Sequence, residues 1–192
     1  MIDPISHFQN LFNQHLQECR LSIPHACCFS TIGLDGYPNS RFVSLKEVID
    51  EGFVITGSLD SLKGKEVKNN NKVALSFWLE SISYQIRIQG EAQQIGKDLA
   101  NKYFYERSKE SQLVTLISKQ GQTIDNYSSL LKELDKASIA YEDNIVPIPE
   151  SWGGLIINPI RIEFLMFKKS RLHQRELFTK DDNKWTSSIL QP

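Results

Sequence analysis

Apolar residues recur at helical spacing near the N-terminus of the chain. The apolar positions of this first segment are Ile5, Phe8, Leu11, Phe12 and Leu16. They repeat every three or four residues behind Asp3, which is typical of an N-cap, and Pro4, which suits a first helical position. The spacing predicts one amphipathic helix over residues 3–19.

Segments rich in β-branched and aromatic residues follow. Strands are predicted over residues 26–32, 40–45, 53–57, 73–79 and 84–94. In the last of them Tyr84, Ile86 and Ile88 alternate with polar residues, which is the period of two that one buried face requires. A Gly-Leu-Asp-Gly-Tyr-Pro turn joins the first two strands into a hairpin. After Ser61, residues 62–67 are predicted to form a short helix.

The second half of the chain is predicted to be helical first and strand-rich afterwards. Apolar residues at steps of three and four predict helix over residues 97–135, with a break around Gly121. Pro147 and Pro149 favour an extended connector. Strands are then predicted over residues 155–167, 171–179 and 185–190. Strand-rich ends around a helical middle predict a mainly β fold with helices (α+β), an antiparallel barrel with appended helices in a single domain over residues 1–192.

Composition narrows the classes of function. The 192 residues carry 22 basic and 23 acidic side chains, a formal net charge of −1, so no overall field attracts nucleic acid or an anionic membrane. No run of about 18 apolar residues and no basic-then-apolar leader is present, so we expect a soluble cytoplasmic protein. Cys19, Cys27 and Cys28 lack metal-ligand spacing, and we expect reduced thiols, with the adjacent pair packed in a strand.

Motifs for nucleophilic and metal catalysis are absent from the sequence. It contains no Gly-rich phosphate loop, no His-Glu-x-x-His, no Cys-x-x-Cys and no Gly-x-Ser-x-Gly. Basic residues in strand-like segments stand out instead: Arg41, Lys46, Arg87, Arg171 and Arg175. Solvated, outward-facing charge explains any one of them, and Arg41 and Lys46 face opposite sides of a regular strand. A cluster of such residues can also bind phosphate through charge-assisted hydrogen bonds, and periodicity leaves both interpretations open.

A series of local motifs runs from residue 41 to the C-terminus. The motifs are Arg41-Phe42-Val43-Ser44-Leu45-Lys46, Gly52-Phe53, Ser61-Leu62-Lys63-Gly64-Lys65-Glu66, Gln85, Tyr103-Phe104, Arg107, Ser111-Gln112, Ser118-Lys119-Gln120, Trp152-Gly153-Gly154, Arg161-Ile162-Glu163-Phe164, Arg171-Leu172-His173-Gln174-Arg175, Trp185 and Leu190-Gln191-Pro192. Together they resemble the pyridoxamine 5′-phosphate oxidase family over nearly the whole chain. The resemblance implies an FMN-binding split β-barrel and a homodimer with FMN at the subunit interface. It also implies C-terminal dimerisation strands over about residues 152–192.

The resemblance further implies FMN contacts in both halves of the chain. The cofactor-binding residues carried over are Arg41, Val43, Ser44, Lys46, Thr56, Gly57, Ser61, Lys63, Gln85, Gln120, Gly121 and Arg175. Among them the three cations Arg41, Lys46 and Lys63 would hold or border the phosphate and ribityl chain of FMN. Ser61 would cap the short helix.

Other residues of this set would meet the flavin ring. By the same resemblance, Gln85 would face the isoalloxazine ring. Gln120, Gly121 and Arg175 would reach the flavin from the other subunit. The alternative is a barrel that keeps this pattern for packing alone.

Substrate contacts follow from the same resemblance. The substrate-binding residues carried over are Lys46, Tyr103, Arg107 and Ser111 for the phosphate, and Arg171 and His173, which are also the candidate catalytic residues, for the pyridine ring and its reacting carbon. Tyr103, Arg107 and Ser111 stand four apart, so on one helix they would line a single face. The alternatives are a solvated helix face and a structural strand histidine whose imidazole bonds a backbone carbonyl.

The implied reaction is transfer of a hydride from C4′ of pyridoxamine or pyridoxine 5′-phosphate to FMN. O₂ then reoxidises the flavin and hydrogen peroxide is released. Because the cofactor carries the redox chemistry, the protein has to place C4′ near the flavin and bind two phosphates separately. No metal is implied.

The chain departs from the family pattern near both phosphate and flavin. Leu62 stands where an arginine is usual, Leu165 where a tryptophan is usual, and Met166-Phe167 where a polar-glycine pair is usual. The sequence begins at the first predicted helix, so we expect the family's preceding segment to be absent or replaced. These departures keep open a flavin oxidoreductase with another substrate, as in phenazine biosynthesis, and a non-catalytic FMN or pyridoxal phosphate binding protein.

Overall fold

The computed structural model describes residues 3–50 and 52–192. The strands are β1 (Ala26–Ile32), β2 (Pro38–Ser44), β3 (Glu47–Ile49), β4 (Gly52–Ser58), β5 (Lys72–Leu79), β6 (Tyr84–Gln94), β7 (Trp152–Met166), β8 (Gln174–Asp181) and β9 (Lys184–Leu190). The helices are α1 (Pro4–Glu18), α2 (Leu62–Asn69), the 3₁₀ helix η1 (Glu80–Ile82), α3 (Lys97–Tyr105), α4 (Lys109–Ile117) and α5 (Tyr127–Ala140). Strands therefore flank a helical middle, as the hydrophobic pattern predicts.

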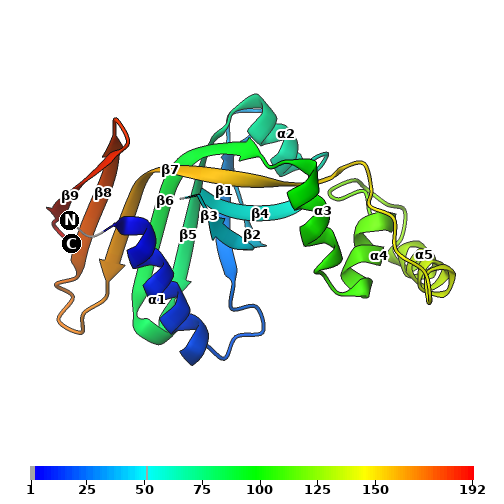
Figure 1. Cartoon of the computed structure of the whole chain (residues 1–192), viewed down its shortest axis with the longest axis horizontal. Helices are drawn as coiled ribbons and strands as arrows, with labels where there is room; N and C mark the ends of the chain where they lie inside the picture. Colours follow the sequence, from blue (N-terminus) through cyan, green and yellow to red (C-terminus); the bar gives the residue numbers. More distant parts are fainter. Residues whose placement is uncertain (1–2, 51) are drawn as a thin grey trace.

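One curled antiparallel sheet contains all of these strands (Figure 1). Its order is β2-β1-β5-β6-β7-β4-β3, and β8 and β9 extend from β7. The long strand β7 connects the two parts, because Trp152 to Ile157 pair with β4 whereas Arg161 to Met166 pair with β8. The Lys46 N–H donates to the Val54 carbonyl at 2.8 Å and ties the β2–β3 connection to β4. The result is a half-barrel with the β8–β9 hairpin at one end.

Helix α1 lies over the curled sheet and buries its apolar face in the main core. Two backbone N–H groups donate to the Asp3 carboxylate, and Pro4 holds the first helical position, as predicted. The Phe8 ring packs against Phe53 and Phe77 with centroid distances of 4.9 and 5.0 Å. Burying one such side chain contributes about 1.5–3 kcal/mol, so packing rather than propensity holds this helix in place.

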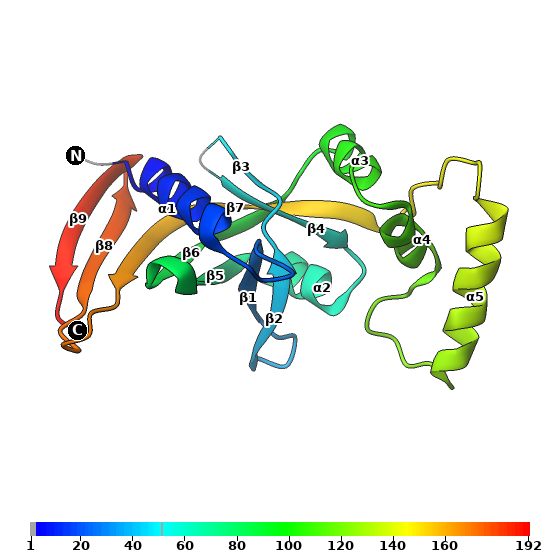
Figure 2. The ribbon, with the colours of Figure 1, turned by 90° about the horizontal axis from the view of Figure 1, so that it is seen from below.

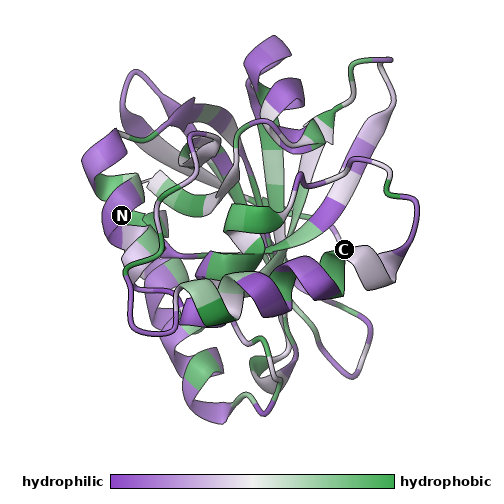
Figure 3. Cartoon of the chain, turned by 90° about the vertical axis from the view of Figure 1, so that its right-hand side faces the viewer, coloured by the Kyte–Doolittle hydropathy of each residue, from purple (hydrophilic) through white to green (hydrophobic). Residues whose placement is uncertain are grey.

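Helices α3, α4 and α5 form the end of the molecule opposite the β8–β9 hairpin (Figure 2). They enclose a second, smaller apolar cluster, in which the Trp152 ring packs on Phe104 at 5.3 Å and its indole N–H donates to the Ala100 carbonyl at 2.8 Å. Apolar and polar residues alternate along α5, which faces the viewer in Figure 3. None of the helices in the described ranges combines the length and apolar character that crossing a bilayer requires.

The helical middle is more divided than the sequence predicts. The predicted break around Gly121 is confirmed, since Gly121 has φ +87° in the loop before α5. A second break separates α3 from α4, because the Ser108 side chain accepts the Ser111 N–H and starts a new helix. The single helical stretch predicted ahead of Gly121 is therefore two helices.

One predicted strand starts later than expected, and one short strand was not predicted. The strand predicted over residues 171–179 begins only at Gln174, because Arg171 adopts a left-handed φ of +65° in the turn after β7. The short strand β3 was not predicted, since three residues are too few for an alternating pattern.

Cys27 lies buried in β1, as expected, and burial raises the pKa of its thiol to about 12. The three cysteines are free thiols.

Candidate functional site

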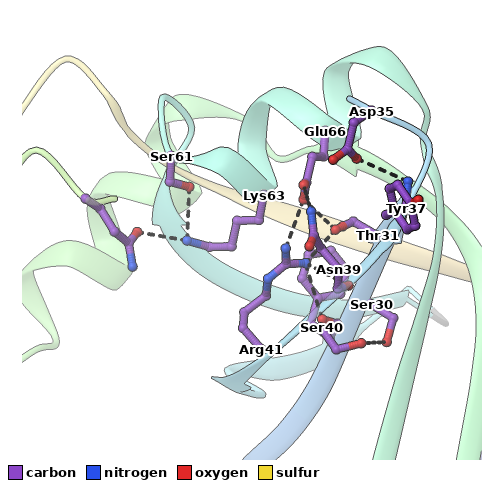
Figure 4. Close-up of polar contacts among 12 residues, drawn as sticks. Ser30, Thr31, Asp35, Tyr37, Asn39, Ser40, Arg41, Ser61, Lys63 and Glu66 are labelled. Carbon is purple, nitrogen blue, oxygen red and sulfur yellow. Dashed lines mark hydrogen bonds and ion pairs between the residues drawn. The ribbon is translucent and has the colours of Figure 1, made fainter. Parts of the chain in front are cut away.

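Lys63 lies in the first turn of α2 with an ammonium group that has only neutral partners in the described chain. Its Nζ donates to Ser61 Oγ at 3.1 Å and to Gln120 Oε1 at 2.9 Å. Burial, and then the nearby positive charge of Arg41, lowers the pKa of Lys63 (Figure 4). An ammonium has three N–H donors, so this partly buried cation still has capacity for an anion.

Arg41 points from β2 into a buried network whose centre is Glu66 (Figure 4). Glu66 is fully buried and accepts hydrogen bonds from Arg41 at 2.9 Å, from Thr31 Oγ1 at 2.6 Å, and from Asn39. A buried carboxylate is tolerated only when it is paired and hydrogen-bonded in this way. Because Glu66 compensates the charge of Arg41, Lys63 is the partly buried cation near α2 that has no carboxylate partner among the described contacts.

Glycines allow the backbone to approach closely around Lys63. A Cβ added to Gly64 would lie 2.0 Å from the Leu59 carbonyl oxygen, so α2 can pack on the end of β4 only with glycine there. A Cβ on Gly57 would lie 3.4 Å from Lys63 Nζ and take up space beside the ammonium. Gly57 and Lys63 thus form one wall of a small pocket at the β4–α2 junction.

Ser61 occupies the N-cap position of α2 without capping it. Its Oγ donates to the Ser58 carbonyl at 2.6 Å, and no side-chain hydrogen bond closes the first turn of the helix. The prediction that Ser61 caps this helix is therefore wrong. The hydroxyl instead accepts from Lys63 and holds the ammonium near the first turn of α2.

A row of cross-strand neighbours on the sheet contains other candidate cofactor residues. Gln85 of β6 pairs with Leu165 of β7, and Leu165 pairs with Arg175 of β8, so the three side chains share one face. Arg175 is fixed by Glu163, with its NH2 2.7 Å from Oε1, and Glu163 also lies 3.6 Å from Arg87. This row gives a surface of one amide, one leucine and one anchored guanidinium.

The remaining candidate cofactor residues have varied surroundings. Val43 packs against the main core and Ser44 is exposed at the end of β2. Thr56 pairs with Gly154 across β4 and β7. Gly121 is exposed in the α4–α5 loop, next to the Gln120 that contacts Lys63 of the same chain.

A second polar group joins the β2–β3 connection to α3. Lys46 Nζ lies 2.7 Å from Glu106 Oε2 and 5.1 Å from the centre of the Tyr103 ring. The buried Tyr103 hydroxyl donates to Glu47 Oε2 at 2.5 Å. Burial and this acidic partner raise the pKa of Tyr103, whereas the hydrogen bond from Lys46 lowers the pKa of Glu106. Lys46 lies beyond the end of β2, which is why it does not follow the alternation of Arg41.

Tyr103, Arg107 and Ser111 do not share one helix face, so that prediction is wrong. Tyr103 belongs to α3, Arg107 to the connection, and Ser111 to α4. The Arg107 guanidinium donates to Thr115 Oγ1 at 2.6 Å and lies 4.8 Å from the Trp152 ring centre, and burial lowers its pKa. Of the four predicted phosphate ligands, the structure brings Lys46 and Tyr103 into direct contact.

Arg171 and His173 lie in the turn between β7 and β8, after the last residue of β7 (Figure 1). Tyr103 belongs to α3, which contacts Trp152 at the other end of β7. His173 Nδ1 accepts the Lys168 N–H at 3.1 Å, and its ring packs 4.9 Å from Phe167. The expected alternative, a strand histidine bonded to a carbonyl, is wrong in both respects. Arg171 is exposed. One chain therefore keeps the two halves of the predicted substrate site apart.

Two family models match the chain. The model described as pyridoxamine 5′-phosphate oxidase matches residues 12–139, and the one described as pyridoxine 5′-phosphate oxidase C-terminal dimerisation region matches residues 152–192. The pyridoxine/pyridoxamine 5′-phosphate oxidase of Pelagibacter ubique is 36% identical, covering 100% of this chain and 92% of the relative. That of Shewanella frigidimarina is 35% identical, covering 95% and 88%. The chain belongs to the pyridoxamine 5′-phosphate oxidase family.

Solved structures confirm the predicted fold for this member of the pyridoxamine 5′-phosphate oxidase family. PhzG from Burkholderia lata 383, in complex with tetrahydrophenazine-1-carboxylic acid, has a TM-score of 0.91 at 24% identity and covers 99% of this chain, which covers 93% of it. A pyridoxamine 5′-phosphate oxidase-related, FMN binding protein from Nostoc punctiforme has a TM-score of 0.80 at 11% identity, with 100% and 98% covered. The split β-barrel with appended helices is confirmed, and the family is one of oxidoreductases.

Three carboxylates of this oxidase family member have no role predicted from the sequence: Glu47, Glu106, and Glu66, which stands in the Ser61–Glu66 motif. Each contacts a residue that was predicted to bind a phosphate or substrate. Adjacency in the sequence does not find these contacts, because Glu47 follows Lys46 but accepts from Tyr103, and Glu106 precedes Arg107 but pairs with Lys46.

Proposed function

We propose that this protein is an FMN-dependent oxidase that converts pyridoxine 5′-phosphate or pyridoxamine 5′-phosphate to pyridoxal 5′-phosphate. O₂ is the electron acceptor and hydrogen peroxide is released. The observation that carries the proposal is the partly buried Lys63 ammonium with only neutral partners in the described chain, in a family whose curated relatives are named as these oxidases.

The residues at the start of α2 fit the phosphate of FMN. The lowered pKa of Lys63 reflects burial and repulsion from Arg41, and the negative charge of a bound phosphate dianion would offset both. The glycine at position 57 leaves space beside the ammonium. Leu62 is exposed and adds no charge, so Lys63 would carry most of the attraction. When bound, FMN supplies the acceptor for a hydride.

The row of Gln85, Leu165 and Arg175 supports a place for the flavin ring on the sheet. Gln85 offers an amide donor and acceptor, and Arg175 is held in position by Glu163. Leu165 provides apolar contact with less flat area than an aromatic residue. These side chains would orient the ring.

A homodimer would complete the substrate site. Tyr103, with Lys46 beside it, belongs to α3, which contacts the start of β7 at Trp152, and Arg107 and Ser111 follow it toward α4. Arg171 and His173 lie in the turn after the other end of β7 (Figure 1). Two chains related by a two-fold axis would bring the phosphate-binding residues of each copy to the β7–β8 turn of the other. The match of residues 152–192 to a dimerisation region supports this arrangement. Arg171 and His173 would then orient the pyridine ring.

Two further proposals concern the chain as a whole. The sheet runs without interruption from β2 to β9, which supports one domain over residues 1–192. Three free cysteines support a reducing compartment such as the cytoplasm.

The test is oxygen uptake by the purified protein. We expect flavin absorbance in the visible range, and oxygen consumption with stoichiometric peroxide when either phosphorylated vitamer is added. Absence of flavin after incubation with FMN would overturn the proposal. Bound flavin without turnover of either vitamer would redirect it to another substrate or to a carrier role.

A further inference from the structure

Both side chains that meet at the predicted substrate phosphate site already have anionic partners. Lys46 Nζ is 2.7 Å from Glu106 Oε2, and the only hydrogen of the Tyr103 hydroxyl is donated to Glu47. A hydroxyl whose hydrogen is already donated offers a phosphate only oxygen lone pairs, which cannot donate a hydrogen bond to an anion. The Tyr103 hydroxyl can therefore donate to a phosphate only after Glu47 has released it. Lys46 keeps further N–H donors, so the obstacle that Glu106 adds there is its negative charge beside an incoming anion.

The charges of the four ionised side chains in contact around Lys46 and Tyr103 balance without a ligand. Lys102 Nζ lies 3.8 Å from Glu106 Oε1, so two ammonium groups, Lys46 and Lys102, face two carboxylates, Glu47 and Glu106. A phosphate dianion placed beside Lys46 with Glu106 still present would meet a like charge at short range. If Glu106 moves away, two cations and one carboxylate remain, and the site attracts an anion.

Glu106 is positioned so that it can move. It follows the last residue of α3, and its side chain is 41% exposed, whereas Glu66 in the Arg41 network is fully buried. A carboxylate at the end of a helix can turn into water with little desolvation cost, and exposed ion pairs of this kind are weak. The Lys46–Glu106 pair is therefore one that a substrate can break.

We propose that Glu106 is a displaceable internal anion that occupies the phosphate position of the substrate site and weakens the binding of phosphate monoesters. The inference rests on the proposed function, because it takes Lys46 and Tyr103 as ligands of the substrate phosphate. Glu106 is a specificity-determining residue in this scheme: it sets how strong an anion must be to reach Lys46. Glu47 also weakens phosphate binding, because it accepts the hydrogen that the Tyr103 hydroxyl would otherwise donate to the phosphate.

The test compares Glu106→Gln with Glu110→Gln in the FMN-saturated protein. Both substitutions remove one negative charge from the α3–α4 region, and Glu110 lies exposed on α4. Glu106→Gln should lower KM for pyridoxine 5′-phosphate about two- to five-fold, the range of an exposed ion pair, with kcat unchanged. The inhibition constant of inorganic phosphate should fall by the same factor. Glu110→Gln should match the unsubstituted protein in both constants.

The KM and phosphate inhibition constants of the two variants decide whether Glu106 competes with phosphate. Equal or raised KM and phosphate inhibition constants for Glu106→Gln would overturn the inference, as would an equal effect of Glu110→Gln. If neither the unsubstituted protein nor a variant oxidises a vitamer, the proposed function is wrong. Calorimetric titration with inorganic phosphate then measures phosphate binding by the two variants directly. Tighter phosphate binding by Glu106→Gln than by Glu110→Gln would then support the displaceable anion, and equal binding would exclude it.

Discussion

The two lysines that were predicted to bind phosphates differ in the partners that the chain supplies. Lys63 is partly buried at the start of α2 and donates to two uncharged oxygens. Lys46 lies at the β2–β3 connection and is paired with the exposed carboxylate of Glu106. The charge of Lys63 is therefore uncompensated by a carboxylate, whereas the charge of Lys46 is paired before any ligand arrives.

The two sites therefore suit ligands with different residence times. A partly buried cation without a counter-ion lowers stability until an anion binds, so the Lys63 site favours a resident phosphate. A balanced, exposed pair costs little to leave empty and little to open, which suits a substrate that enters and leaves in each cycle. A cofactor phosphate at Lys63 and a substrate phosphate at Lys46 are consistent with these two environments.

The largest effect is expected from removing Glu66, because this carboxylate keeps Arg41 from adding to the uncompensated charge of Lys63. Glu66→Ala should lower the free energy of unfolding by about 3–5 kcal/mol, since Arg41 and Thr31 lose a fully buried partner. Urea unfolding of the FMN-free protein measures it, with the exposed Glu110→Ala as control. Equal midpoints for the two variants would show that Arg41 is satisfied without Glu66.

Removal of the Lys63 charge tests the resident-phosphate half of the comparison. Lys63→Met should raise the dissociation constant of FMN about 10- to 100-fold, because one charge-assisted hydrogen bond contributes about 1.5–3 kcal/mol. Fluorescence titration of FMN measures the constant. Lys65→Met, an exposed lysine on the same helix, is the matched control. A similar loss in both variants would mean that α2 attracts FMN only through its general positive charge.

The fold was largely predictable from the sequence because its elements depend on local patterns. The spacing of Phe8 and its neighbours is a property of α1 itself, and buried and exposed positions alternate from Ile86 to Gln93 in β6. The missed features are those that a local pattern cannot carry. Ser108 ended one helix and began the next through a single side-chain hydrogen bond, and β3 was too short to show a period.

The site was predictable in a different way. Resemblance named the residues, and their roles toward FMN and substrate stay predictions. The partners came from long-range contacts: Glu47 lies 56 residues from Tyr103 and Gln120 lies 57 residues from Lys63 along the chain. No spacing rule connects such pairs. The balance of charge that separates Lys63 from Lys46 therefore emerged only from the folded arrangement.

FMN binding should depend on pH through the charge of Lys63. The pKa of Lys63 is lowered from the ordinary lysine value of 10.5, so the ammonium loses its proton earlier than an exposed lysine does. FMN affinity should fall by about 10-fold as the pH rises through that lowered pKa, and this pH-dependent loss should be absent in Lys63→Met.

The stability of the FMN-free protein should respond with the opposite sign. The charged form of Lys63 is disfavoured in the folded state, so its contribution is unfavourable at neutral pH and is relieved as the pH rises. FMN titrations and urea unfolding over the same alkaline series measure the two trends. Parallel trends in FMN affinity and FMN-free stability would contradict this account of Lys63.

The smallest effect concerns the surface beside the resident cofactor. Leu165 lies between Gln85 and Arg175 in the cross-strand row, and a tryptophan there would add flat area for stacking. Leu165→Trp should lower the dissociation constant of FMN about two- to ten-fold, the range of about 0.5–1.5 kcal/mol for aromatic contacts. Ile160→Trp adds the same ring to an exposed position of β7 away from this row and should leave the constant unchanged. Because Lys63 would anchor the phosphate in both variants, any difference between them reports the ring. Weaker or equal binding in Leu165→Trp would place the flavin ring elsewhere and leave the Lys63 site as a phosphate anchor alone.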